Sequence, residues 1–187
     1  MKLIKIAGIS VVSVVVLFFG IAIYLPSQVH IKRSITIPAS QEIVFEQVND
    51  LRTWRYWSPW QQADPNMEIT YVGFLSGKNA SYRWKSKRIE NGQLTITKSD
   101  PYNSIATRMQ FGQREVIGNY RFVSNGDRTI LTWIYTTDVG ENPIAKYMGI
   151  LMDPLVGPEL QQGLVNLKNY INSLDTTLMT QQRANND

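Results

Sequence analysis

The sequence contains no cysteine and a single histidine, and these two scarcities exclude much of metal and nucleophile chemistry. Without cysteine there is no disulfide, no thiolate ligand and no cysteine nucleophile. Zinc sites draw mainly on cysteine and histidine, so we expect no metal site and no cofactor. A Ser–His–Asp triad would depend on His30, just past a hydrophobic run, where an interfacial or strand-edge residue is the more typical interpretation.

Excess charge of one sign is also nearly lacking. The chain has 19 Lys and Arg against 15 Asp and Glu, and two of the basic residues, Lys2 and Lys5, lie ahead of every acidic one. From Pro26 onward the net charge is only +2, with 17 basic and 15 acidic residues. Nucleic-acid binding needs a concentrated basic stripe, so we expect no nucleic-acid partner. Gly-rich phosphate loops and the G-x-S-x-G nucleophile motif are absent too.

The most distinct segment is an uncharged run of 20 residues, 6–25, with the sequence IAGISVVSVVVLFFGIAIYL. As a helix it would span ~30 Å, the thickness of a bilayer core. It follows a short basic N-terminus, residues 1–5, and Pro26 ends it. The length and the lack of an A-x-A-like pattern favour an uncleaved transmembrane anchor over a signal peptide. The chain is then a single-pass membrane protein, with its domain on the outer (periplasmic or extracytoplasmic) side, although Lys32 and Arg33 nearly balance the basic N-terminus.

The rest of the chain alternates between apolar and polar residues, the pattern of half-buried strands. Turn signals separate the alternating segments, the strongest being Asn125-Gly126. The predicted strands are residues 29–37, 67–74, 80–85, 94–97, 105–111, 116–122 and 128–137. Turns at this spacing indicate an antiparallel meander.

Helical spacing occurs in three places. Ser40 can cap a short helix with the apolar stripe of residues 43–48, and residues 51–57 predict a second helix that Pro59 closes. Residues 144–174 predict a long C-terminal helix, kinked or built in two pieces because of Pro154 and Pro158. The polar residues 175–187 predict a flexible tail.

This order of elements predicts an α+β fold, in which a long C-terminal helix packs on a curved antiparallel sheet of about seven strands. Three stretches carry a family resemblance: residues 35–60 (ITIPASQEIVFEQVNDLRTWRYWSPW), 64–71 (DPNMEITY) and 142–171, which opens NPIAKYMGILMD. They resemble the START-like, helix-grip proteins (the SRPBCC superfamily), in the polyketide cyclase/dehydrase-type branch with bacterial, membrane-anchored members. The resemblance covers residues 28–174, the predicted START-like domain.

The resemblance implies a cavity between the sheet and the C-terminal helix that holds a lipid or another hydrophobic small molecule. Aromatic side chains suit such a wall because they combine a large apolar area with one polar group. Methionine adapts to irregular partners. The candidate cavity residues are Trp54, Trp57, Trp60, Tyr71, Tyr82, Trp84, Met109, Phe111, Tyr120, Phe122, Trp133, Met148 and Met152. Plain core packing of the same residues, with no cavity, is the competing interpretation.

Three functions remain open from the sequence. The first is a membrane-tethered, non-enzymatic binding domain for a hydrophobic molecule. The second is a cyclase- or dehydrase-like enzyme, which needs a polar cavity residue such as Tyr71, Tyr82, Tyr120 or Glu68. The third is a membrane-anchored interaction module, which requires a large exposed apolar patch. No residue is assigned as catalytic, because no pair of carboxylates has a spacing that demands acid–base chemistry.

Overall fold

The computed structural model describes residues 2–184, and its centre is one antiparallel sheet of seven strands in the order β1-β7-β6-β5-β4-β3-β2. The strands are β1 (Gln28–Ile37), β2 (Glu68–Val72), β3 (Ser81–Lys85), β4 (Gly92–Asp100), β5 (Ser104–Phe111), β6 (Arg114–Asn125) and β7 (Arg128–Asp138). Consecutive strands from β2 to β7 are neighbours, and β1 completes the sheet beside β7. The predicted α+β meander is therefore confirmed.

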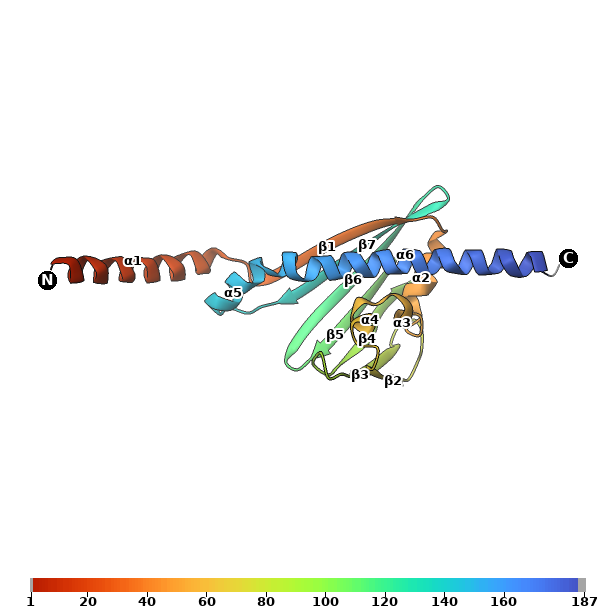
Figure 1. Ribbon diagram of the computed structural model, residues 1–187, viewed down its shortest axis with the longest axis horizontal. Helices are drawn as coiled ribbons and strands as arrows, with labels where there is room; N and C mark the ends of the chain where they lie inside the picture. The colour runs from red at the N-terminus through yellow and green to blue at the C-terminus, as the bar shows by residue number, and fades with distance from the viewer. Residues whose placement is uncertain (1, 185–187) are drawn as a thin grey trace.

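The described residues also form six helices: α1 (Lys2–Tyr24), α2 (Gln41–Asn49), α3 (Trp54–Trp57), α4 (Pro59–Ala63), α5 (Pro143–Ile150) and α6 (Met152–Ala184). The Ser40 hydroxyl accepts a hydrogen bond from the Ile43 amide, so it caps α2 as predicted. Asn142 caps α5 by accepting from two amides of its first turn. In Figure 1, α6 runs the length of the sheet, and α2, α3 and α4 close one end of the space beneath it.

Helix α4 was not predicted from the sequence. Pro59 looks like the end of a helix, but proline is also favoured in the first turn of a helix, where its missing N–H has no partner to lose. Here Pro59 begins α4, and Ser58 separates it from α3. The break places Trp60 on a different helix from Trp54 and Trp57.

The C-terminal helix is built in two pieces, as predicted, but the break falls at Leu151 rather than at Pro154 or Pro158. Pro158 lies inside α6. Helix α6 continues to Ala184, and residues 185–187 of the predicted tail lie outside the described residues.

The predicted transmembrane anchor needs correction. Within residues 2–184, no helix combines the length and the apolar character that crossing a membrane requires. The single-pass anchor over residues 6–25, and the membrane localisation built on it, are therefore wrong. The prediction rests on length, the absence of charge and the lack of a cleavage pattern. It missed that the far end of α1 packs on α5, where the Phe18 and Tyr147 rings stack 4.5 Å apart and the Tyr147 hydroxyl donates to the Phe18 carbonyl at 3.0 Å.

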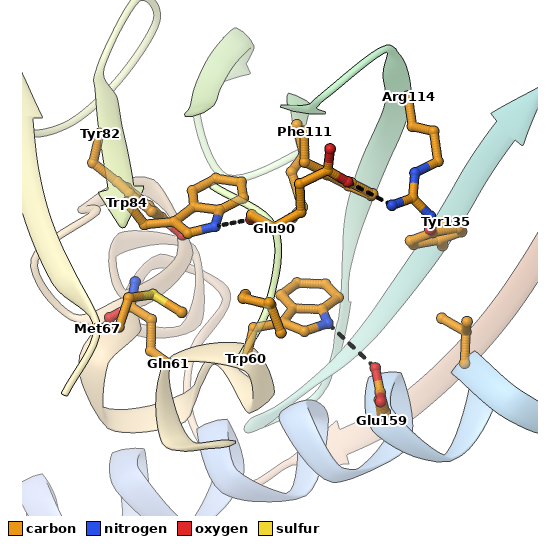
Figure 2. A pocket seen from close by; sticks show the side chains of 13 residues that line it. Trp60, Gln61, Met67, Tyr82, Trp84, Glu90, Phe111, Arg114, Tyr135 and Glu159 are labelled. Carbon is orange, nitrogen blue, oxygen red and sulfur yellow. Dashed lines mark hydrogen bonds and ion pairs between the residues drawn. The ribbon is translucent and has the colours of Figure 1, made fainter. Parts of the chain in front are cut away.

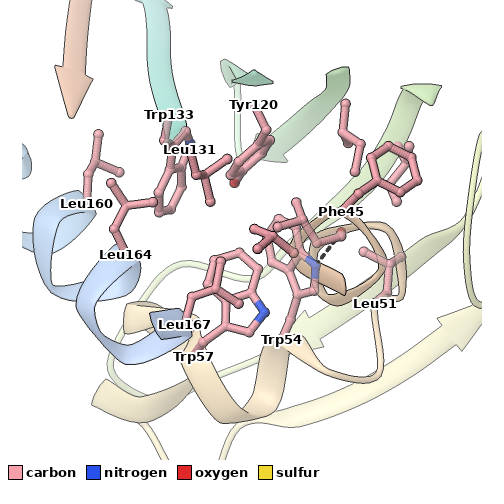
Figure 3. Packing of buried hydrophobic residues seen from close by; sticks show 14 of the residues in the cluster. Phe45, Leu51, Trp54, Trp57, Tyr120, Leu131, Trp133, Leu160, Leu164 and Leu167 are labelled. Atoms are coloured by element: carbon pink, nitrogen blue, oxygen red, sulfur yellow. Dashed lines mark hydrogen bonds between the residues drawn. The ribbon is translucent and has the colours of Figure 1, made fainter. Parts of the chain in front are cut away.

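The interior between sheet and α6 is filled by interlocking aromatic rings. Trp54 and Trp57 contact each other at 4.6 Å between ring centroids, and Tyr120 stacks on Trp133 at 5.0 Å. Leucines of α6, among them Leu160, Leu164 and Leu167, cover these rings (Figure 3). All of these side chains are almost completely buried. The centre of the domain is therefore a packed core.

Candidate functional site

Beside this packed core, a cavity of about 340 Å³ lies between α4, the strands β3, β5, β6 and β7, and the start of α6. Apolar and aromatic side chains form most of its wall, with a few polar groups among them (Figure 2). The lining residues are Trp60, Gln61, Met67, Tyr82, Trp84, Ile89, Glu90, Met109, Phe111, Arg114, Tyr135, Val156 and Glu159. The volume lies in the lower part of the range for small-molecule sites, about 300–1,000 Å³.

Trp84 is held on the cavity wall by a glycine and by a hydrogen bond. A Cβ atom on Gly92, its partner in β4, would lie only 2.4 Å from the indole carbon Cζ2, so the ring can lie over the strand only because residue 92 is glycine. The Trp84 indole N–H donates to the Glu90 carbonyl at 2.8 Å. The ring therefore presents a fixed apolar surface to the cavity.

Charged groups gather at the side of the cavity near α6. The Trp60 indole N–H donates to the Glu159 carboxylate at 3.2 Å, which links α4 to α6. Arg114 forms an ion pair with Glu90 at 2.6 Å, and its guanidinium lies 4.9 Å from the centre of the Phe111 ring. Figure 2 shows these groups around the same rim. With two carboxylates and one guanidinium, this rim is slightly acidic.

At the other side of the cavity lie Gln61 and Tyr82. The Gln61 amide nitrogen is buried and has no hydrogen-bond partner at normal distance within the described part of the chain. Burial raises the pKa of the Tyr82 phenol well above its usual range, although the nearby Gln61 amide partly opposes that rise. The phenol therefore stays protonated at neutral pH and can donate a hydrogen bond. An unpaired buried amide is costly, by about 1–3 kcal/mol, unless a ligand or water satisfies it.

Most of the candidate cavity residues lie in three places: on the cavity wall, in the packed core and at a neighbouring groove. Trp60, Tyr82, Trp84, Met109 and Phe111 line the cavity. The packed core holds Trp54, Trp57, Tyr120, Phe122 and Trp133. Tyr71 lines a neighbouring groove, and Met152 packs partly buried against the core.

Met148 lies on the surface of α5 with 51% of its area exposed, away from the cavity lining. Its helical spacing with Met152 spans the break at Leu151, so the two side chains do not share one helix face.

Several lining residues were not predicted. Met67 and Tyr135 belong to segments in which apolar and polar residues alternate. That alternation could have assigned both side chains to the inner face of the sheet. No sequence pattern indicates that Gln61, Glu90 and Glu159 line a cavity, because an isolated polar residue in a turn or helix is typical of a solvent-exposed position. Glu68, the other acid–base candidate, lies exposed on the edge strand β2.

His30 lies on β1, at one edge of the sheet, where its Nδ1 atom is 3.0 Å from the Thr136 hydroxyl. In the described part of the chain, no group of three or more His, Asp or Glu side chains is placed to hold a metal ion.

Fold and cavity together define a helix-grip domain with a small, mainly apolar pocket beside its core. Residues 28–172, more than half of the chain, match the family described as polyketide cyclase / dehydrase and lipid transport. The chain belongs to this family, as the resemblance of its motifs predicted. A comparison with curated proteins gave no match.

Solved structures share the fold at low sequence identity. Norcoclaurine synthase from Thalictrum, a point mutant in complex with a transition-state analogue, is 12% identical with a TM-score of 0.61, covering 79% of this chain and 96% of its own. Ara h 8.0201 is 12% identical with a TM-score of 0.56, covering 78% and 99%. A Thermus thermophilus protein is 14% identical with a TM-score of 0.57, covering 78% and 98%. At these identities the likeness concerns the fold alone.

Proposed function

We propose that this domain binds a small hydrophobic molecule in the cavity beside Trp60 and Trp84, without chemical conversion of the ligand. The observation that carries the proposal is the contrast between a core filled with aromatic rings and an adjacent space of about 340 Å³ walled by similar side chains. An empty space with apolar walls lowers the stability of the fold, because its lining side chains lose packing contacts. A bound apolar molecule restores those contacts and offsets the loss.

The cavity favours a compact, partly aromatic ligand with one hydrogen-bond acceptor. Trp84 and Phe111 offer flat apolar surfaces to a ring, and Met109 adapts to its outline. The Gln61 amide and the Tyr82 phenol both have donors on the same side of the cavity. An acceptor on the ligand would satisfy the buried Gln61 nitrogen, which favours ligands with an oxygen at that end.

The proposal is tested by titrating the full chain with naphthalene in isothermal calorimetry. Met109→Trp adds a large side chain to the cavity wall and is expected to weaken binding at least about tenfold, which corresponds to about 1.4 kcal/mol. Met148→Trp is the matched control: it makes the same change on the exposed face of α5 and is expected to leave affinity unchanged. Equal affinities for wild type and Met109→Trp, or no binding by wild type, would contradict the proposal.

A second candidate is a cyclase- or dehydrase-like activity. The observation that favours it is a protonated phenol, Tyr82, on the wall of a cavity that also carries the Glu159 carboxylate. The similarity of fold to norcoclaurine synthase is compatible with it. Tyr82→Phe distinguishes the two: an enzyme that uses the phenol as a proton donor loses turnover, about 10²–10⁴-fold, while a binding domain keeps its affinity for naphthalene.

A further inference from the structure

A second hollow, a groove of about 580 Å³, lies between α3, α4 and β2. Its lining includes Arg55, Ile69 and Tyr71. It also includes Gln61 and Met67, which line the cavity as well. Two side chains are therefore shared by the two spaces. Figure 2 shows Gln61 and Met67 together, on the side of the cavity opposite Glu159 and Tyr135.

Gln61 and Met67, which separate the cavity from the groove, have few contacts that hold them in place. Gln61 belongs to α4, a helix of five residues with none fully buried, and its amide nitrogen makes no hydrogen bond of normal length to another described residue. Met67 lies just ahead of β2, at the edge of the sheet, and methionine changes shape easily because its chain is unbranched. Because these two side chains line both spaces, their rotation is the movement that would join the cavity and the groove.

The groove contains a guanidinium without a carboxylate partner. Arg52 pairs with Asp50 at 2.5 Å and Arg114 pairs with Glu90 at 2.6 Å, but Arg55 has no ion pair with any residue that the structure describes. Instead its guanidinium lies 5.3 Å from the centre of the Tyr56 ring. Tyr56 in turn stacks on Tyr170 of α6 at 4.8 Å. The guanidinium thus lies against an aromatic ring at the groove, and it donates no hydrogen bond to another residue in the described part of the chain.

Tyr71 lines the same groove as this cation. Partial burial raises the pKa of its phenol, and the positive charge of Arg55 partly opposes the rise. The phenol is therefore protonated at neutral pH and can donate a hydrogen bond beside the guanidinium. Together the two groups offer an anion one charge and several donors, the combination that recognises a carboxylate.

The groove also has a carboxylate, Asp64, but it is already engaged. It is buried and accepts hydrogen bonds from the Ser86 hydroxyl at 2.6 Å and the Asn66 amide at 3.1 Å. The Ser86 hydrogen bond lowers its pKa, with a contribution from the charge of Arg88. Asp64 therefore keeps its negative charge, but its two carboxylate oxygens already accept hydrogen bonds from these neutral donors. At the far rim of the cavity, by contrast, Glu90 and Glu159 outnumber Arg114.

We propose that the cavity and the groove form one channel for an elongated amphiphile, with its apolar chain in the cavity and a carboxylate at Arg55 and Tyr71. The proposal rests on the proposed function, because the chain must enter the same cavity. The difference in charge sets the direction: an anionic group is favoured at Arg55 and disfavoured at the rim near Glu159. The site for the anion is a specificity element separate from the cavity wall.

The test compares dodecanoate with dodecanol, which have the same chain and differ in charge at the head. Isothermal calorimetry of the full chain is expected to show dodecanoate binding about tenfold more tightly, equivalent to about 1.4 kcal/mol. The difference should shrink at high salt, because Arg55 is solvent-exposed. Arg55→Gln is expected to remove the preference without changing the affinity for dodecanol. Arg83→Gln, on the outer face of β3, is the matched control and should keep the preference.

Naphthalene, which is apolar and has no anionic group for Arg55, separates the two proposals. If naphthalene binds but dodecanoate has no advantage over dodecanol, or if Arg55→Gln leaves that advantage intact, the channel proposal is overturned and the proposed function stands. Dodecanoate that binds without displacing naphthalene also overturns it, because the two ligands then do not share the cavity. If neither naphthalene nor an alkyl chain binds, both proposals fail. Thermal melts of each variant establish that it is folded.

Discussion

Two regions of one domain, both rich in aromatic side chains, differ in whether they are filled. Beneath α6, Trp54, Trp57, Tyr120 and Trp133 contact one another and leave almost no area exposed. Beneath α4, Trp60, Trp84 and Phe111 surround about 340 Å³ of space. Residue type alone does not separate the two regions. The two regions are covered by different helices: α6 packs closely on the Trp133 ring at Gly163, while the five-residue α4 carries Trp60 and Gln61 over the open space.

Hydrogen bonding separates Trp54 and Trp57 from Trp60, although the Trp84 indole in the open region also donates to a main-chain carbonyl and the buried Trp133 indole nitrogen has no partner among the described residues. In the filled region the Trp54 and Trp57 indoles donate to main-chain carbonyls of α2, at 3.0 Å and 3.2 Å. In the open region Trp60 donates instead to the side chain of Glu159, and the Gln61 amide nitrogen has no hydrogen-bond partner of normal length among the residues that the structure describes. A side chain that is hydrogen-bonded to another side chain can change position more easily than one that is hydrogen-bonded to the backbone of a helix. The open region is therefore the part of the domain suited to receiving a ligand.

The largest change in the free energy of unfolding is expected from removing a buried side chain of the filled region. Trp57→Ala removes a completely buried indole and is expected to lower the free energy of unfolding by about 3–5 kcal/mol. Trp60→Ala removes the same side chain from the cavity wall, where part of the ring already faces open space, so we expect roughly half that loss. Urea denaturation measures both. Equal losses would show that the two regions are packed alike.

The next effect comes from the close approach of α6. A Cβ on Gly163 would lie 2.9 Å from Pro59 Cδ and 3.1 Å from Trp133 Cζ3. Gly163→Ala is therefore expected to destabilise the domain by about 1–3 kcal/mol through overpacking. It should also shift α4, and so change naphthalene affinity.

Gly20→Ala is the matched control, since no atom outside its own helix neighbourhood lies within 4 Å of a Cβ at that helical position. It is expected to be neutral or to stabilise slightly, by up to about 1 kcal/mol. A thermal melt in which the two variants behave alike would contradict the close approach.

The smallest effect concerns the turn that carries Ile89 and Glu90 to the cavity. The hydrogen bond from Ser86 holds the pKa of Asp64 below its ordinary value of 3.8. A lowered carboxyl pKa in the folded state stabilises the fold above the unfolded value and loses that contribution as the pH falls through the folded value. Asp64→Asn is therefore expected to melt lower than wild type at pH 7, with the gap closing below about pH 4. A gap that is constant from pH 7 to pH 3 would contradict this assignment.

Much of the fold could be predicted because local patterns determine it. Alternation located all seven strands, and the helical period located the core-facing leucines of α6. The sequence predicts one helix over residues 51–57 that Pro59 closes, but Pro59 also begins α4, which carries Trp60. Sequence spacing could not reveal this because proline both ends and begins helices.

The site was predicted less completely, for a physical reason. Whether an aromatic residue fills a core or borders a cavity depends on the distance between backbones, which Gly163 and the path of α4 set. Polar residues such as Gln61 and Glu159 become part of the cavity through tertiary packing alone. The apolar run at residues 6–25 illustrates the converse, since length and hydrophobicity were given more weight than its contact with α5.

The most direct test of ligand binding in the open region is NMR of the full chain labelled with ¹³C at the methionine methyl groups, titrated with naphthalene. Met67 and Met109 line the cavity, whereas Met148 is exposed on α5. We predict that the methyl signals of Met67 and Met109 shift and saturate together while that of Met148 stays in place. Signals of Met67 and Met109 that do not move at saturating naphthalene, or a shift confined to Met148, would contradict the account.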